Sequence, residues 1–187
     1  MTVKEIIKNT AAMIGREDVI KYLEEGEKAS IGKDTLASVD ILTRLLNLVV
    51  NELACSYIPM IKAEKVTSND GKIYHKNLSE TPLRILSVYD EDGNSIDFKV
   101  DSLYTETSRG AVNVEYSYTP TVYGIDEEIG YSEKDVSMNV LCYGLAAEFA
   151  VSQGSFDEAV TWHGRYANGV ALKCLPKNSR IKGRRFV

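Results

Sequence analysis

The sequence predicts an α+β protein: a helical bundle with an inserted antiparallel β-sheet domain and an extended C-terminal arm. Three observations predict this class. Apolar residues recur with a helical period before residue 58 and again from about residue 136, and between these regions they alternate with polar residues, as in strands. The last eleven residues, 177–187, carry five Lys or Arg residues and no acid. We therefore expect a discontinuous bundle (1–60 and 133–175), a β domain (61–132) and an arm (176–187).

The N-terminal part predicts three helices. Thr2 followed by Glu5 fits a capping box, which starts a helix that Gly15 ends. A short second helix spans about residues 17–25. The third runs from about Asp34 for roughly six turns until Pro59. Its apolar face is wide enough to contact more than one neighbour, and it consists of Leu36, Val39, Leu42, Leu45, Leu46, Val49, Val50, Leu53 and Tyr57.

Alternating residues then predict an antiparallel sheet over residues 61–120. Two half-buried strands are indicated by Ile96, Phe98 and Val100, and by Val112, Val114, Tyr116 and Tyr118. Turn signals fall at hairpin spacing at Asp70-Gly71, Asp92-Gly93-Asn94 and Arg109-Gly110.

Two more helices are predicted after a loop at 121–132. The first has a plausible cap within residues 132–135. Ser155 and Glu158 form a second capping box, which opens the last helix. Its expected stripe toward the bundle consists of Phe156, Val160, His163, Ala167 and Val170. The two helical regions, distant in sequence, should pack together and leave the sheet as an outgrowth.

Charge is segregated along the chain. It has 22 Lys and Arg residues against 27 Asp and Glu, and six of the bases but none of the acids lie in 173–187, so the preceding 172 residues carry a net charge of −11. An acidic body disfavours binding of phosphate backbones. The basic end predicts a local contact, in which Arg184 and Arg185 bind carboxylates and Phe186 fills a pocket.

Candidate chemical sites are weak. Residues 26–33 depart from a phosphate-binding loop because five residues separate the glycines and Asp34 replaces Ser or Thr. Asp90-Glu91-Asp92-Gly93-Asn94 fits a hairpin turn better than a calcium loop. His163 is expected to be packed or interfacial. The three cysteines suggest neither a disulfide framework nor a zinc site, and no uncharged stretch approaches the length of a membrane span. We therefore expect no catalytic residue, cofactor, metal or membrane contact, and assembly in a reducing cytoplasm.

The order of these elements resembles the head-to-tail adaptor (connector) proteins of tailed bacteriophages, in particular the tail tubular protein A-like adaptors of short-tailed phages. "TVKEIIKNTAAMIGREDVIKYLEEG" and "TLASVDILTRLLNLVVNELACSYIPM" are similar to the adaptor bundle. "PLRILSVYDEDGNSIDFKVDSLYTETSRGAVNVEYSYTP" resembles its inserted sheet, and "VLCYGLAAEFAVSQGSFDEAVTWHGRYANGVALK" its returning helices.

The resemblance implies a non-enzymatic virion protein of the phage neck, assembled in the host bacterial cytoplasm. Its copies would form a ring, typically a dodecamer, between the portal protein and a tail or nozzle protein, through which DNA passes without specific binding. The implied portal-binding arm consists of Lys177, Arg180, Ile181, Lys182, Arg184, Arg185 and Phe186. Tyr104, Tyr116 and Tyr118 are the implied tail-facing residues of the β domain.

Three alternatives stay open on the sequence. The first is another tail-completion, neck or baseplate component built from similar parts. The second is a small hydrolase that uses a Cys–His pair without a local signature. The third is a nucleic-acid-binding accessory protein that uses the basic arm, although the acidic body opposes this.

Overall fold

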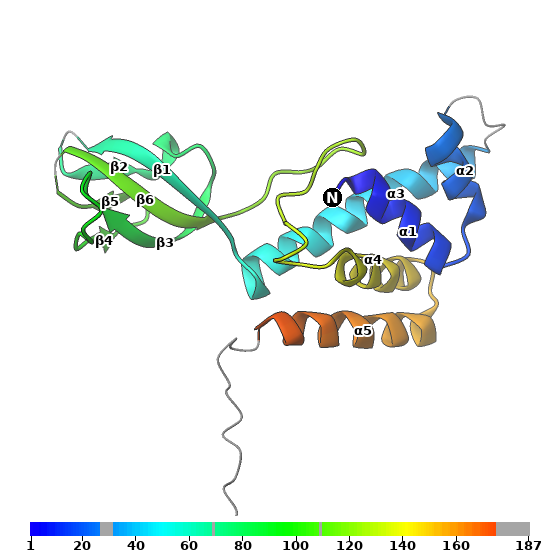
Figure 1. The fold of residues 1–187 in the computed structure, drawn as a ribbon. Coiled ribbons are helices and arrows are strands. Elements are labelled where there is room, and N and C mark those ends of the chain that lie inside the picture. Colours follow the sequence, from blue (N-terminus) through cyan, green and yellow to red (C-terminus); the bar gives the residue numbers. More distant parts are fainter. Residues whose placement is uncertain (27–31, 69, 109, 175–187) are drawn as a thin grey trace, which may run out of the picture.

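The computed structural model describes residues 1–26, 32–68, 70–108 and 110–174. Helices lie at both ends of this part of the chain and strands lie between them, so the α+β prediction is confirmed. The helices are α1 (Val3–Met13), α2 (Glu17–Glu25), α3 (Lys33–Glu52), α4 (Met138–Ser152) and α5 (Phe156–Cys174). Figure 1 shows the helices gathered in a bundle, with the strands in a separate β module that projects from one end.

The start of α1 is fixed by the expected capping box. The Glu5 backbone N–H donates to Thr2 Oγ1 at 3.2 Å, and the Thr2 N–H donates to Glu5 Oε2 at 2.9 Å. These bonds satisfy two donors that a helix start otherwise leaves unpaired. Hydrogen bonding also lowers the pKa of Glu5, chiefly through the Thr2 backbone N–H.

The end of α3 is a π-helical turn, η2 (Leu53–Tyr57), that the sequence did not reveal. The Ile58 N–H donates to Leu53 O at 2.7 Å, which closes this wider turn. Pro59 cannot continue the helical hydrogen bonding, and β1 (Met60–Ser68) begins directly after it. The π turn therefore marks the joint where the chain leaves the bundle for the β module.

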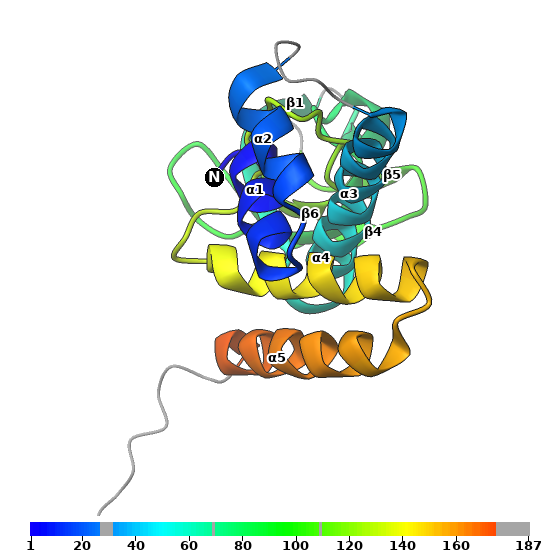
Figure 2. The ribbon, with the colours of Figure 1, turned by 90° about the vertical axis from the view of Figure 1, so that its right-hand side faces the viewer.

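Helix α4 forms the centre of the bundle. Nine of its fifteen residues are buried, because α1, α3 and α5 all pack against it. Figure 2 shows α5 beneath α4, with α1, α2 and α3 on its other side. Gly144 is a point of close approach to two neighbours at once: a Cβ there would lie 2.8 Å from Val49 Cγ1 on α3 and 3.0 Å from the ring of Tyr166 on α5. The two helical regions therefore pack together as expected.

The β module consists of two small antiparallel sheets. One has the order β1–β6–β3, with β6 (Gly110–Tyr118) between β1 and β3 (Pro82–Tyr89). The other has the order β2–β5–β4, formed by Lys72–Tyr74, Tyr104–Glu106 and Lys99–Val100. Their shared core includes side chains from both sheets and from the loop after the short 3₁₀ turn η3 (His75–Asn77): Ile73, Leu78, Ile85, Val88, Val112, Val114 and Tyr116. Only residues 99–100 of the expected strand around Phe98 are strand in the described structure.

The segment between β6 and α4 belongs to the bundle rather than to the β module. Ile129 and Tyr131 are part of the bundle core, and Thr2 forms an isolated β-bridge with Glu128. The strand-rich part thus ends at Tyr118, before the expected boundary at residue 132. The cap of α4 also differs: Ser137 precedes the helix, whereas Ser132 and Asp135 form a turn in which Ser132 Oγ donates to Asp135 Oδ2 at 2.6 Å.

Candidate interaction surfaces

The expected portal-binding residues, Lys177, Arg180, Ile181, Lys182, Arg184, Arg185 and Phe186, lie outside the described residues. The structure does describe the place from which they continue. α5 ends at Cys174, whose Sγ lies 3.8 Å from Tyr57 O at the end of the π turn. Helix α5 therefore ends beside the joint between the bundle and the β module.

Tyr104 is half-buried on the outer sheet of the β module. It lies directly opposite Tyr74, and the ring centroids are 6.0 Å apart. The Lys72 ammonium lies 4.2 Å from the Tyr104 ring centroid, close enough for a cation–π contact. Nearby Leu103 is 71% exposed. Exposed aromatic and aliphatic side chains with cations are typical of a protein-binding surface.

Tyr116 is not a surface residue, which corrects the expectation that it faces the tail. Its side chain is fully buried between the sheets, because it shares the inward face of β6 with Val112 and Val114. Tyr118 is half-buried and contacts Tyr116 edge-on, at a centroid distance of 6.5 Å. It packs against both hydrophobic cores, which places it near the joint.

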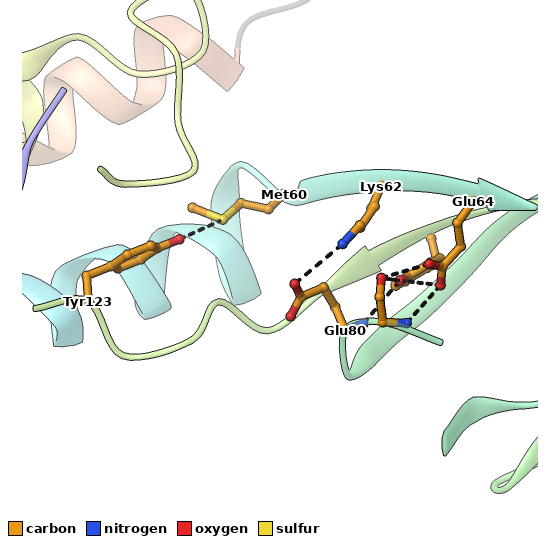
Figure 3. Close-up of polar contacts among 7 residues, drawn as sticks. Met60, Lys62, Glu64, Glu80 and Tyr123 are labelled. Atoms are coloured by element: carbon orange, nitrogen blue, oxygen red, sulfur yellow. Dashed lines mark hydrogen bonds and ion pairs between the residues drawn. The ribbon is translucent and has the colours of Figure 1, made fainter. Parts of the chain in front are cut away.

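A buried hydroxyl and a carboxylate hold the loop after η3 against the sheet. Tyr116 Oη donates to Glu64 Oε1 at 2.8 Å, and Ser79 donates to Glu64 through its N–H at 3.0 Å and its Oγ at 2.7 Å. Beside them on β1, Lys62 lies 3.5 Å from Glu80 (Figure 3). Burial raises the pKa of Glu64, but the hydrogen bonds from Ser79 and Tyr116 outweigh it and hold that pKa below its usual value.

Two tyrosines connect the joint to the bundle. Tyr131 Oη donates to Ile58 O at 2.6 Å, and Tyr123 Oη accepts from the Gly130 N–H at 3.2 Å. The Tyr123 hydroxyl also points toward Met60 Sδ, at 4.0 Å (Figure 3). Burial is the main cause of the raised pKa of both phenols. These contacts fix the strand that leaves the bundle against the segment that returns to it.

Helix α5 buries a stripe that shares only Val170 with the one expected. Its buried side chains are Ala159, Tyr166 and Val170, whereas Phe156 and Val160 are 66% and 73% exposed. His163 and Ala167 are exposed as well. Both stripes have helical spacing, so periodicity does not distinguish them. The close approach of Tyr166 to Gly144, and of Gly169 to Val140, decides which one faces α4.

The first two turns of α5 border a hollow at the end of α1. This open hollow has a volume of about 450 Å³ and is lined by Met13, Ile14, Asp157, Glu158, Thr161 and Trp162. Trp162 stacks on Tyr143 at a centroid distance of 5.9 Å, and the Arg165 guanidinium lies 4.8 Å from the Trp162 centroid. The aromatic wall of the hollow is therefore held by neighbours on both α4 and α5.

Cys142 has unfavourable surroundings for a catalytic nucleophile. Cys142 is buried, its Sγ lies 3.7 Å from Ile6 O, and burial raises the pKa of the thiol, which disfavours the nucleophilic thiolate. His163 is exposed, with its ring 6.0 Å from that of Tyr166. In the described ranges, no three His, Cys, Asp or Glu side chains gather in a way that could hold a metal ion. No helix in those ranges has the length and apolar character needed to cross a bilayer.

Comparison with known proteins adds no relative. No protein-family model matches the chain, and no curated protein matches it significantly.

Sequence reasoning missed the hollow and the hydrogen bonds from Ser79 and Tyr116 to Glu64, which we call the Glu64 clamp. Glu64 occupies an ordinary polar position of an alternating strand, and its partners are fifteen and fifty-two positions away. The hollow joins residues of α1 and α5, whose proximity depends on how both helices pack on α4. The burial of Tyr116 did have a signal, since its parity along the strand matches that of Val112 and Val114.

Proposed function

We propose that this protein is the head-to-tail adaptor of a tailed bacteriophage. In this proposal it is a structural subunit of the virion neck, and its copies form a ring around the DNA passage between the portal protein and the tail. The β module faces the tail side, with Tyr104 in its contact surface. The arm, from Lys177 to Phe186, binds the portal.

The observation that carries the proposal is the arrangement of the two parts. A β module projects from one end of a helical bundle (Figure 1), and the last helix leads into the basic segment beside the joint. A subunit of this form offers separate surfaces to two different partners. Helix α5 supports the proposal further, because only three of its nineteen residues are buried and most of its surface is available to a neighbour.

The charge distribution is consistent with a DNA passage. The first 172 residues carry a net charge of −11, so a lumen lined by them repels phosphates and does not hold a moving duplex. In the proposal, the basic residues of 173–187 bind an acidic surface on the portal.

Electron microscopy of the protein mixed with its portal tests the proposal. We expect a ring on one face of the portal for the full chain and no ring after deletion of residues 177–187. A variant that replaces Asp40 and Arg44, an exposed ion pair on α3, by alanine serves as the control and should retain the ring. If the ring still forms after the deletion, the arm is not the segment that binds the portal. Imaging of the virion locates the ring relative to the capsid vertex and so separates an adaptor from a baseplate or other tail component.

A further inference from the structure

The first two turns of α5 carry different features on opposite flanks. Successive residues of an α-helix are rotated by about 100°, so Phe156 and Val160 project to one flank, whereas Asp157, Thr161 and Trp162 are centred on the other. We call Phe156 and Val160 the knob, and the hollow is the one lined by Met13, Ile14, Asp157, Glu158, Thr161 and Trp162. Knob and hollow therefore lie at the same level along the helix axis.

The knob fits the hollow in size and polarity. Phe156 and Val160 are 66% and 73% exposed, and because they lie one turn apart they form an exposed apolar patch on this flank. Three of the six residues that line the hollow have apolar side chains: Met13, Ile14 and Trp162. A cavity of about 150 Å³ accepts a benzene ring, and the hollow has about 450 Å³. An aromatic side chain in such a position is the kind of anchor that dominates binding energy.

The charges favour a second copy of this chain as the occupant. The hollow has an acidic rim, formed by Asp157 and Glu158, and two bodies with a net charge of −11 repel one another over most surfaces. The flank that carries the knob has no acidic residue: it continues with His163, Gly164, Ala167 and Ala171. The imidazole of His163 offers an N–H donor to a rim carboxylate. This flank can thus approach the hollow without like-charge repulsion.

We infer that neighbouring copies of this chain meet through α5, with the knob of one copy seated in the hollow of the next. The inference rests on the ring proposed above and names the surfaces that join its subunits. Because the two surfaces differ and lie on opposite flanks, the contact is heterologous. A heterologous contact repeats from copy to copy and ends when a ring closes, whereas an isologous contact stops at a pair.

Disulfide trapping tests the contact directly. In a full-length background with Cys55→Ser and Cys174→Ser, which removes both exposed thiols, Val160→Cys and Thr161→Cys are prepared as separate proteins. Both positions are exposed. We expect a cross-linked dimer when the two are mixed under mild oxidation over a range of concentrations, and little dimer from either alone. Leu172→Cys mixed with Thr161→Cys is the matched control, because Leu172 is 71% exposed but lies about three turns from the hollow.

Truncation of the knob gives a second readout. Phe156→Ala should weaken self-association by about tenfold or more, the loss typical of an anchor residue, whereas Leu172→Ala should not change it. Sedimentation over a concentration series measures both, and thermal unfolding checks that both variants fold. The inference would be overturned if Phe156→Ala and Leu172→Ala self-associated equally strongly. It would also be overturned if no mixed cross-link formed at any concentration.

The outcomes separate this inference from the adaptor proposal. Rings on the portal that persist in Phe156→Ala would refute the knob contact and leave the adaptor function standing. A mixed cross-link in a protein that forms no ring on the portal would support the knob contact and refute the adaptor function.

Discussion

The hydroxyl of Tyr116 connects two parts of the β module that are far apart in sequence. It donates to Glu64 on β1 and accepts from the Glu80 N–H at 3.3 Å. Such a buried hydroxyl matters for stability mainly because its removal leaves its partners without a hydrogen bond. The net energy of the bond itself is smaller. The same residue illustrates a limit of sequence reasoning: alternation along the strand predicts its burial, whereas its partners follow only from the fold.

Replacement of Tyr116 by phenylalanine tests this role. We expect Tyr116→Phe to lower the free energy of unfolding by about 1–3 kcal/mol, because Glu64 loses a donor and the Glu80 N–H loses an acceptor. Tyr118→Phe is the matched control, since no hydrogen bond of the Tyr118 hydroxyl is found within the described residues, and it should have little effect. Urea unfolding measures both. Equal losses in the two variants would argue against the clamp.

Asp18 predicts a pH dependence of stability. Arg16 donates to it through Nε and Nη2, each at 2.8 Å, and this pairing is the main reason that the pKa of Asp18 lies far below its ordinary value of 3.8. A carboxyl group with a lowered pKa stabilises the fold above its unfolded-state pKa, and this contribution is lost as the pH falls through the folded-state pKa. The contribution is therefore complete at neutral pH and decreases below pH 3.8.

The variant Asp18→Asn measures that contribution. At neutral pH we expect a loss of less than about 1 kcal/mol in the free energy of unfolding, because the ion pair is partly exposed. The difference between wild type and variant should narrow as the pH is lowered from about 7 to about 2.5. Urea unfolding at several pH values checks this. A difference that stays constant over this range would show that Asp18 acts without its charge.

The helices illustrate how far local sequence signals reach. The capping box of α1, the positions of α2 and α5 and the end at Pro59 were predicted, because each depends on residues within one or two turns. The buried face of α5 was predicted wrongly except at Val170. Two stripes of this helix have the same period and similar polarity, and only the close contacts at Gly144 and Gly169, which involve α3 and α4, select between them.

Two glycine substitutions test how tightly the helices pack. We expect Gly144→Ala to lower the free energy of unfolding by about 1–3 kcal/mol, because its Cβ would lie 2.8 Å from Val49 and 3.0 Å from Tyr166. Gly164→Ala, on the exposed side of α5 with no atom within 4 Å of the new Cβ, should instead raise it by about 0.5–1 kcal/mol. Thermal or urea unfolding gives the sign of each change. A neutral Gly144→Ala would mean that α4 can move away from α3 and α5.

The bundle and the β module are joined by two chain crossings, and the second is held by a side-chain amide. Asn47 on α3 donates from Nδ2 to Tyr123 O at 2.9 Å and accepts from the Tyr123 N–H at 2.7 Å. The Asn47 amide thus pairs with both backbone groups of Tyr123, as a neighbouring strand would in a sheet. It holds the segment that returns from the β module against the bundle. The sequence predicted a loop there, but it did not indicate where the loop would lie, because the amide and its partner are seventy-six positions apart.

Loss of this amide should loosen the returning segment. We expect Asn47→Ala to lower the free energy of unfolding by about 1–3 kcal/mol, because it leaves backbone groups of Tyr123 without partners. Hydrogen exchange at the Tyr123 amide should become faster, while exchange in the β-module core around Val114 should change much less. Uniform acceleration in both places would indicate global destabilisation instead of local release.

The central place of α4 has a consequence for biosynthesis. The apolar side of α3 leaves the ribosome long before α4, its main cover, because the whole β module is translated between them. Until about residue 152 has emerged, the apolar face of α3 is exposed on the nascent chain. A chaperone must bind this face, or the nascent chain aggregates. Translation products that end before α4 should therefore be insoluble, and the bundle should fold only after α4 has been synthesised.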